Sequence, residues 1–462
     1  MRFEIITSPG IAHNSYFFAN NGEACVIDPR RDAQIYIDLA KQECAEILYI
    51  FETHRNEDYV IGSLELQNLT GAEIGHSQYT PFKYGEYRVK DGDTFNISHF
   101  RIEALYTPGH TNDCICYALT DTATSKRPFM VFTGDTLFIG DIGRTDLPGL
   151  DIWEEMTEKQ YHSLHEKLLP LGDDVLIYPA HGAGSICGHK LSDRNFSTIG
   201  YEQTHNPVLQ LEKEAFIEHI LSIKLRRPPY FRKMEEYNLV GPPLLRDAPV
   251  PKALSVNQFK KALENPNTIV VDTRNPDAYA ASHLAGSLSI WLRGLSFYPG
   301  WVITHDQQLV LIVERPEDMG VVKPYLWRLG YDNIIGYLCP GIEAWRNKGN
   351  PTDQFGTITT QQLKEKLEKN EIVLIDVRST AECESGFVEG SKYIYVGELA
   401  RHLDKIPRDK PLAIACATGL RGSLAASILR KHGFNDISNV LGGLKAWVAL
   451  GYPMVQECPA II

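Results

Sequence analysis

Short apolar runs alternate with polar loops from Met1 to about Val240. The loops are rich in glycine, aspartate and histidine, and the clearest apolar runs before them are 24–27, 47–51, 129–132 and 175–178. Apolar runs of this length that are followed by turn residues predict buried strands. Strands that end in polar loops are typical of a layered α/β sandwich, and we predict one over residues 1–240.

A proline-rich stretch follows the predicted sandwich. Residues 241–252 contain Gly241-Pro242-Pro243 and, further on, Ala248-Pro249-Val250-Pro251. Because proline restricts the backbone, such a segment forms a semi-rigid spacer, and we predict a linker at this place.

The remainder of the chain contains an internal duplication. Three short blocks occur twice in the same order, about 100 residues apart. They are Val270-Val271-Asp272-Thr273-Arg274 with Leu374-Ile375-Asp376-Val377-Arg378, Ala285-Gly286-Ser287 with Glu389-Gly390-Ser391, and Pro340-Gly341-Ile342-Glu343-Ala344-Trp345 with Gly442-Gly443-Leu444-Lys445-Ala446-Trp447. Each copy alternates strand and helix patterns, which predicts two related α/β domains, at residues 253–354 and 355–462.

The composition fits a globular protein of several domains. A chain of 462 residues is long enough for roughly three domains of ~150 residues each. Its hydrophobic fraction of 43% and charged fraction of 23% are ordinary for such proteins. The net charge is -12 and no dense run of lysine and arginine occurs, so we expect neither nucleic acid nor membrane as a partner.

The N-terminal residues and the cysteines bear on the cellular location. The start, Met1-Arg2-Phe3-Glu4-Ile5-Ile6-Thr7, lacks the apolar run of a signal peptide, and no later segment is long enough to span a bilayer. The nine cysteines are scattered without the spacing of a zinc ribbon. We therefore expect a cytoplasmic protein with reduced thiols.

Four residues in the first region are candidate metal ligands. They are His54, His110 in Thr107-Pro108-Gly109-His110-Thr111, Asp135 in Thr133-Gly134-Asp135-Thr136, and His181 in Tyr178-Pro179-Ala180-His181. Each follows an apolar run that we predict to be a strand, where a loop can direct a side chain into a shared cleft. A single histidine of this kind is usually an ordinary residue, but the ordered set of four predicts a metal site.

Over residues 1–240 this set resembles the metallo-β-lactamase superfamily, and Asp28 fits the resemblance too. The family's loop His-x-His-x-Asp-His binds two metals, but here its second and third histidines are Asn56 and Tyr59. Tyr59 depletes one site, because a neutral phenol with a pKa of about 10 is a poor zinc ligand. Asn56 reduces the other site to His54, His110 and Asp135, so a two-metal hydrolase is not expected.

Two imidazoles and one carboxylate form the facial triad of non-haem Fe(II) oxygenases. This subset is similar to the iron site of persulfide dioxygenases, a branch of the same superfamily. The resemblance implies one Fe(II) per chain on His54, His110 and Asp135, with Asp58 and His181 orienting ligands or bound water.

Two further residues near this predicted centre have alternative interpretations. In the resemblance, Arg144 of Gly143-Arg144-Thr145-Asp146 holds the carboxylate of a thiol cofactor, but it can instead pair structurally with Asp146 or Asp141. Cys187 lies in a glycine-rich loop that could bring its sulfur to the metal and accept a persulfide sulfur. The alternative for Cys187 is a small buried side chain.

The last repeat carries a candidate nucleophile. Cys416 follows the apolar run 412–415 and precedes Ala417-Thr418-Gly419-Leu420-Arg421 and an Ala/Leu/Ile helix. Loop amides and a helix N-terminus both stabilise a thiolate or persulfide. This unit resembles the rhodanese sulfurtransferases over about residues 355–456. The resemblance implies that Cys416 carries sulfur and that Arg421 helps to bind an anionic acceptor.

The earlier repeat lacks this chemistry. Val313 stands where the cysteine is expected, and Glu314-Arg315-Pro316-Glu317-Asp318 replaces the loop. We therefore predict that this rhodanese-like domain is a spacer or docking domain. It can also hold the other two domains in a fixed relative position.

Taken together, the chain resembles bacterial fusions of a persulfide dioxygenase with rhodanese domains, which serve sulfide detoxification. The resemblance implies that a low-molecular-weight thiol persulfide and O2 give sulfite, and that sulfur transfer to sulfite gives thiosulfate. Two alternatives are a glyoxalase II-like thioester hydrolase and a non-oxidising sulfurtransferase or scaffold. The sequence leaves open the thiol carrier, a homo-oligomeric state, and direct sulfur transfer between Cys187 and Cys416.

Overall fold

The computed structural model describes residues 1–189, 191–223 and 225–456 and divides into two compact units. The first unit is Met1–Asp247 with Trp327–Gly330, and the second is Ala248–Leu326 with Tyr331–Ile462. Among the helices in the described ranges, none is long and apolar enough to cross a membrane. The domain boundaries proposed above at 240, 252 and 354 stay predictions.

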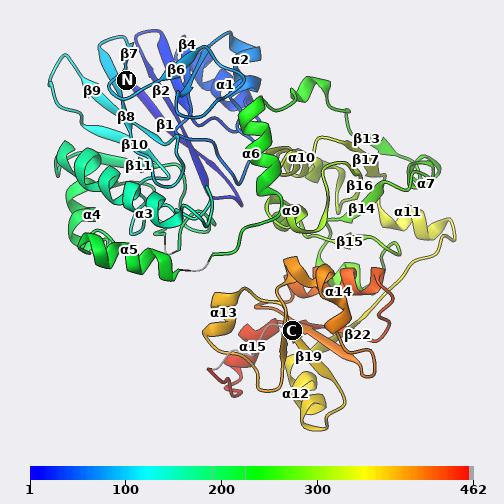
Figure 1. Ribbon diagram of the computed structural model, residues 1–462. Coiled ribbons are helices and arrows are strands. Elements are labelled where there is room, and N and C mark those ends of the chain that lie inside the picture. The colour runs from blue at the N-terminus through cyan, green and yellow to red at the C-terminus, as the bar shows by residue number, and fades with distance from the viewer. Residues whose placement is uncertain (190, 224, 457–462) are drawn as a thin grey trace. The chain divides into compact units, whose positions relative to one another are not determined.

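The first unit contains two six-stranded mixed sheets (Figure 1). The first sheet has the strand order β1-β2-β3-β4-β5-β6 and the second has the order β12-β11-β10-β9-β8-β7. The strands of the first sheet are β1 Arg2–Ser8, β2 His13–Asn20, β3 Glu23–Ile27, β4 Glu46–Phe51, β5 Glu73–Ser77 and β6 Tyr87–Val89. Those of the second are β7 Thr94–Ile97, β8 Phe100–Tyr106, β9 Ile115–Asp121, β10 Met130–Gly134, β11 Leu176–Pro179 and β12 Ser197–Thr198.

Helices cover the outer face of each sheet (Figure 1). Two of them, α1 Gln34–Gln42 and α2 Ser63–Thr70, pack on the first sheet. The second sheet packs against α3 Trp153–His162, which a π-helix at Ser163–Leu168 continues, and against α4 Ile199–His205 and α5 Lys213–Ser222. The last helix of this unit is α6 Phe231–Val240.

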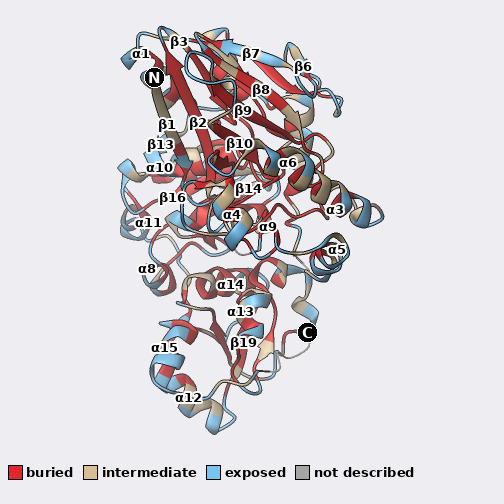
Figure 2. Ribbon diagram, turned by 90° about the vertical axis from the view of Figure 1, so that its left-hand side faces the viewer, coloured by how far each residue is buried: buried red, intermediate tan, exposed pale blue. Residues whose placement is uncertain are grey.

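Alternation along the strands builds the layers of this sandwich. In β9, Ile115 and Tyr117 face the core between the sheets, whereas Cys116 and Ala118 face the helices. Strand residues i and i+2 lie on one face of a sheet, so a strand buried on both faces is apolar throughout. Figure 2 shows most of these strands as buried. The predicted sandwich is confirmed, and the four predicted strands coincide with β3, β4, β10 and β11.

The second unit contains two five-stranded parallel sheets of the same topology. Their orders are β13-β17-β16-β14-β15 and β18-β22-β21-β19-β20. The first copy comprises β13 Lys252–Leu254, α7 Val256–Leu263, β14 Thr268–Asp272, α8 Pro276–Ala281, β15 Leu288–Ser289, α9 Pro299–Val302, β16 Gln308–Ile312, α10 Met319–Arg328, β17 Ile334–Leu338 and α11 Ile342–Asn347. The second comprises β18 Gly356–Thr359, α12 Thr360–Glu368, β19 Val373–Asp376, α13 Thr380–Glu384, β20 Lys392–Tyr393, β21 Leu412–Ala415, α14 Leu420–Lys431, β22 Ile437–Leu441 and α15 Gly443–Ala449.

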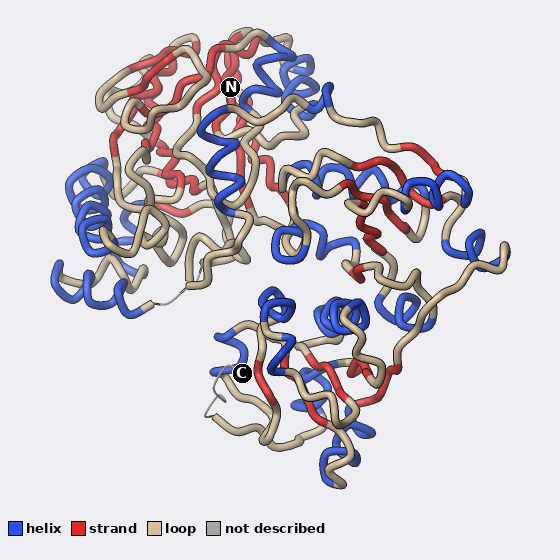
Figure 3. Tube along the Cα trace, turned by 45° about the vertical axis from the view of Figure 1, so that its right-hand side comes forward, coloured by secondary structure: helices blue, strands red, loops and turns tan. Residues whose placement is uncertain are grey.

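The predicted duplication is therefore confirmed, and Figure 3 shows strands alternating with helices along this part of the chain. The repeated Asp-x-Arg block has one structural job in both copies. Arg274 binds Asp272 and donates to the Ser282 carbonyl at 2.8 Å, while Arg378 binds Asp376 and donates to a carbonyl at 2.7 Å. The pair ties the end of a strand to the chain that follows the next helix.

The expectation of reduced thiols needs one correction. Seven cysteines carry free thiols, among them Cys187 and Cys416, but Cys383 is disulfide-bonded. Scattered spacing could not reveal this bond, because disulfide pairing depends on how the chain folds.

Candidate metal centre and cysteine site

Three loops of the first unit bring His54, His110 and Asp135 together. His54 follows β4, His110 follows β8, and Asp135 follows β10. The Asp135 Oδ2 atom lies 3.8 Å from His54 Nε2 and 3.5 Å from His110 Nε2. All three side chains are buried. These are the three residues that the sequence selects as an iron triad.

Each histidine is oriented through its other ring nitrogen. His110 Nδ1 lies 2.7 Å from the Arg144 carbonyl oxygen, which can only accept a hydrogen bond. His54 Nδ1 lies 3.0 Å from Thr53 Oγ1, and that hydroxyl donates to Asp28 at 2.7 Å. Nδ1 is therefore the protonated nitrogen of both rings, and both Nε2 lone pairs face Asp135. This arrangement of partners is typical of metal-binding histidines.

His181 holds the aspartate in place. Its Nδ1 lies 2.8 Å from Asp135 Oδ1, and its Nε2 lies 3.2 Å from Asp58 Oδ2. Burial disfavours the charged form of Asp135, but His181 and His54 outweigh it and hold the pKa of Asp135 well below its ordinary value. The His181 ring thus connects the Asp135 and Asp58 carboxylates, which fits an orienting role for His181 and Asp58.

The hydrogen bonding of His110 is consistent with a bound cation. His110 Nε2 is buried and has no hydrogen-bond partner among the described residues. A buried imidazole nitrogen without a partner is costly, and a bound divalent cation would satisfy it. The two residues that depart from the family's loop face other groups: Asn56 Nδ2 donates to the His54 carbonyl at 3.3 Å, and Tyr59 packs on His13 with ring centroids 4.1 Å apart.

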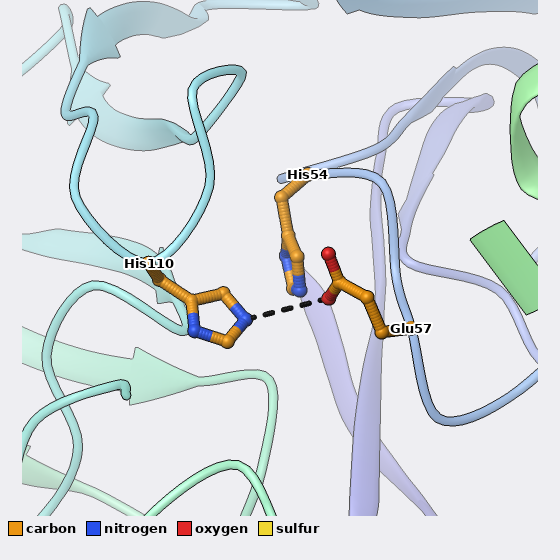
Figure 4. Close-up of side chains that lie close together, drawn as sticks. All are labelled: His54, Glu57 and His110. Atoms are coloured by element: carbon orange, nitrogen blue, oxygen red, sulfur yellow. Dashed lines mark ion pairs between the residues drawn. The ribbon is translucent and has the colours of Figure 1, made fainter. Parts of the chain in front are cut away.

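Glu57 is a residue of this cluster that the sequence reasoning missed. Its carboxylate turns toward the two histidines (Figure 4), and Oε2 lies 3.6 Å from His110 Nε2. Ligand atoms of His54, Glu57 and His110 all lie within 4.8 Å of one another. Glu57 occupies a variable position of the family's loop pattern, so the pattern gave no signal for it.

Cys187 lies beside the same donors. Its Sγ forms one group with His110 and Asp135 and another with Asp58 and His181, each within 4.8 Å. The thiol is also buried, and burial together with Asp58 and Asp135 raises its pKa well above the ordinary value. The thiol is therefore both a buried side chain and a neighbour of the donors, and its role stays a prediction.

Arg144 fixes the loop that carries Cys187. Its guanidinium binds Asp146 through Nε at 2.7 Å and Nη2 at 2.6 Å. Nη1 donates to the Ile186 carbonyl at 3.3 Å, and the Arg144 backbone N–H donates to the Cys187 carbonyl at 3.0 Å. Further donors reach the Arg226 and Leu225 carbonyls. The geometry favours the structural alternative, since a substrate carboxylate would have to displace one of these partners.

An asparagine on α6 holds the metal loop from outside, and the sequence reasoning missed it. Asn238 Nδ2 donates to the carbonyls of Asn56 and Tyr59, both at 2.7 Å, and its Oδ1 accepts from the Ile61 N–H at 3.0 Å. The Asn238 side chain is fully buried. A lone asparagine far along the chain carries no pattern that could have indicated this contact.

The second unit places Cys416 in a backbone cradle. Cys416 directly follows β21 and is buried, and the Gly419 N–H lies 3.1 Å from its Sγ. Helix α14 begins at Leu420, so its N-terminus faces the same loop. The Gly-Gly-Trp block closes the cradle, because a Cβ at Gly443 would lie 2.3 Å from the Cys416 carbonyl oxygen. Only glycine permits this approach.

Arg421 is paired rather than free. Glu382 on α13 accepts from Nη1 at 2.6 Å and from Nη2 at 2.7 Å. The Tyr298 hydroxyl also faces Arg421. Burial, together with the neighbouring Cys416 and Glu382, raises the pKa of Tyr298 to about 12. Tyr298 belongs to the copy that lacks the cysteine. That copy therefore contributes a side chain beside Arg421, which the sequence could not indicate.

Comparisons with known families agree with this architecture. The metallo-beta-lactamase superfamily matches residues 9–181, and the rhodanese-like domain matches residues 255–348 and 359–450. Persulfide dioxygenase ETHE1 of Bos taurus is 34% identical over 212 residues, which cover 45% of this chain and 74% of that protein. The Homo sapiens protein of the same name is 33% identical over the same shares.

Two further comparisons concern a hydrolase and a solved structure. Hydroxyacylglutathione hydrolase GloC of Haemophilus influenzae is 28% identical over 231 residues, covering 45% of this chain and 98% of that protein. A crystal structure described as a metallo-beta-lactamase from Staphylococcus aureus is 30% identical with a TM-score of 0.64. It covers 73% of this chain and 98% of that chain.

Proposed function

Because the chain belongs to the persulfide dioxygenase family of the metallo-β-lactamase superfamily, fused to two rhodanese-like domains, we propose that it converts a thiol persulfide to sulfite and then to thiosulfate. In the first reaction RSSH, O2 and water give RSH and sulfurous acid, which ionises to sulfite. The outer sulfur is oxidised and O2 is reduced. The observation that carries this proposal is the convergence of His54, His110 and Asp135 on one buried point.

The donor set supports Fe(II) as the metal. Two neutral imidazoles and one carboxylate suit a non-haem iron with open positions for a thiolate-type substrate and O2. Bound there, Fe(II) supplies the redox chemistry that a reaction with O2 requires. His181 keeps Asp135 ionised and oriented, and the Arg144 and Thr53 oxygens keep each Nε2 lone pair available.

The proximity of the Cys187 sulfur to the donor atoms supports a role for it as an acceptor of substrate sulfur. In this step the Cys187 sulfur bonds to the outer sulfur of RSSH, the S–S bond of the substrate breaks, and the proton leaves with RSH. The raised pKa of this thiol means that a base must take its proton first. Of the titratable groups beside the sulfur, Asp58 and His181 are those outside the proposed iron triad.

Cys416 carries the second reaction. The Cys416 thiolate first takes the outer sulfur of a second RSSH, whose S–S bond breaks as RSH leaves. The sulfur lone pair of sulfite then attacks the outer sulfur of the Cys416 persulfide, thiosulfate leaves, and Cys416 remains as a thiolate. The Gly419 N–H and the start of α14 stabilise that thiolate. The Arg421 guanidinium provides positive charge at the cradle, and Glu382 and Tyr298 fix where it lies.

The test separates the two reactions with two variants of the full chain. With iron-replete protein and a panel of low-molecular-weight persulfides, His110→Ala is expected to abolish O2 uptake. Cys416→Ser is expected to keep O2 uptake and to lose enzymatic thiosulfate formation. A wild-type protein loaded with iron that consumes no O2 with any persulfide of the panel would refute the proposal.

The thioester hydrolase is the rival reaction for the first unit. The chain is 28% identical to the hydrolase GloC. This identity supports the shared fold but does not identify the reaction. A hydrolase of this type would use two zinc ions, so two zinc per chain with thioester hydrolysis and no O2 uptake would favour it over the dioxygenase.

A further inference from the structure

We propose that Glu57 is a fourth protein ligand of the metal centre. It would replace the second histidine of the family's loop, which is Asn56 in this chain. The inference rests on the proposed metal site of His54, His110 and Asp135, to which it adds a carboxylate that the family's pattern does not contain. The proposed donor set is then two imidazoles and two carboxylates.

The geometry around His110 supports this assignment. The Nε2 atom of His110 lies 3.6 Å from Glu57 Oε2 and 3.5 Å from Asp135 Oδ2. Its lone pair is therefore flanked by two carboxylates. Figure 4 shows Glu57 reaching the two histidines from the same loop that carries His54. The Glu57 side chain is 1% exposed and Asp135 is fully buried.

Burial of two carboxylates around one imidazole requires a compensating positive charge. Removal of a carboxylate from water is unfavourable unless partners replace the lost hydration. Neither Glu57 oxygen has a hydrogen-bond partner among the residues that the structure describes. A divalent cation would satisfy both oxygens and balance the two negative charges of the donor set.

The alternative is that Glu57 only neutralises Arg55. The Arg55 Nη2 atom lies 3.6 Å from Glu57 Oε1, but it also lies 3.8 Å from Glu235. Arg55 is 25% exposed and so reaches solvent, whereas Glu57 does not. A carboxylate that serves Arg55 alone could stay partly exposed, as Glu235 is at 17%, so the full burial of Glu57 favours the metal assignment.

A fourth donor has two chemical consequences. If a bound iron accepts six ligands, four protein donors would leave two positions, enough for a persulfide sulfur and O2. A second negative donor also favours the higher oxidation state of a bound iron, because ligand charge stabilises the more positive ion. The loop would thereby keep a single-metal site tight despite the missing histidine.

The experiment measures Fe(II) affinity of the full-length apo protein by anaerobic competition with a chromophoric chelator. Glu57→Gln keeps the shape of the side chain and removes its charge, and we expect Fe(II) to bind about 10- to 100-fold more weakly. Glu235→Gln removes a carboxylate from the other side of Arg55 and is the matched control, with unchanged affinity. X-ray absorption on the loaded Glu57→Gln protein should show one oxygen donor fewer than wild type.

The outcomes distinguish this inference from the proposed function. Wild-type affinity in Glu57→Gln, with an unchanged X-ray absorption spectrum, overturns the assignment of Glu57 and leaves the iron triad standing. A wild-type chain that binds no Fe(II) overturns both. If Glu57→Gln does not fold, as judged by circular dichroism, Glu57→Asp replaces it. The shorter carboxylate should weaken Fe(II) binding, and an unchanged affinity would again contradict the assignment.

Discussion

At the residue scale, hydrogen bonds decide what each reactive side chain can do. The Arg144 carbonyl and the Thr53 hydroxyl select the Nε2 lone pairs of His110 and His54. In the second unit, Glu382 takes both terminal nitrogens of Arg421. A paired arginine keeps its charge at a fixed place, whereas an unpaired one would move with its flexible stem. Glu382 is therefore a positioning residue for the sulfur-transfer site.

Substitution of Glu382 should weaken sulfur transfer without affecting O2 uptake. Glu382→Gln removes the charge that holds Arg421, and charge-assisted hydrogen bonds of this kind contribute about 1.5–3 kcal/mol. We expect kcat/KM for thiosulfate formation to fall about tenfold, which corresponds to roughly 1.4 kcal/mol. Glu384→Gln, an exposed residue of the same helix α13, is the control. Equal kinetics of the two variants would contradict the positioning role.

The same pair predicts a pH dependence of stability. Burial alone would raise the pKa of Glu382, but hydrogen bonds from Arg421 outweigh burial and lower this pKa from 4.5 to about 2. A depressed pKa stabilises the folded state above the unfolded value of 4.5, and this stability is lost as the pH falls toward 2. The melting temperature of wild type should exceed that of Glu382→Gln by more at pH 7 than at pH 3.5. A constant difference would argue against the pair.

At the scale of elements, strands place the donors and a distant helix holds the loop between them. The three proposed iron ligands follow β4, β8 and β10, and their loops meet at one end of the two sheets. The loop after β4 has little regular structure, so its shape depends on outside contacts. Asn238 on α6 supplies three of them, to Asn56, Tyr59 and Ile61.

Removal of the Asn238 side chain should therefore loosen the metal loop. Asn238→Ala leaves two buried carbonyls and one N–H without a partner, and each such group costs about 1–3 kcal/mol. We expect a lower melting temperature of the first unit and weaker Fe(II) binding, measured by calorimetry and chelator competition. Glu236→Ala removes an exposed side chain of the same helix, which pairs with Lys233 at 3.0 Å, and should change neither quantity. Fe(II) affinity equal to wild type in Asn238→Ala would show that the loop does not need this contact.

At the scale of the whole molecule, the candidate residues for each proposed reaction lie within one unit. The proposed iron ligands all belong to the first unit, and Cys416, Arg421 and Tyr298 all belong to the second. The repeat that has Val313 at the position of Cys416 is part of that second site, because it supplies Tyr298. The two proposed reactions share sulfite, a small anion that dissolves readily in water.

Two inactive variants should therefore complement each other in solution. His110→Ala retains Cys416 but makes no sulfite, and Cys416→Ser makes sulfite but cannot transfer sulfur. We expect a mixture of the two, supplied with persulfide and O2, to form thiosulfate faster than either alone. The double variant mixed with Cys416→Ser measures the reaction of sulfite with free persulfide. If sulfite accumulates and the mixture forms no more thiosulfate than the control, the two sites must lie on one chain.

The sequence by itself determined the layered sandwich and the duplication, and it selected His54, His110, Asp135 and Cys416 as candidate site residues. These features leave local marks, since strand alternation, motif order and glycine spacing are all properties of neighbouring residues. Only the tertiary structure decided the positions of Glu57, Asn238 and Tyr298 and the pairing of Arg144 and Arg421. Each of these depends on which backbone or side-chain atoms from elsewhere in the fold fill the space around it, and no pattern of neighbouring residues encodes such contacts.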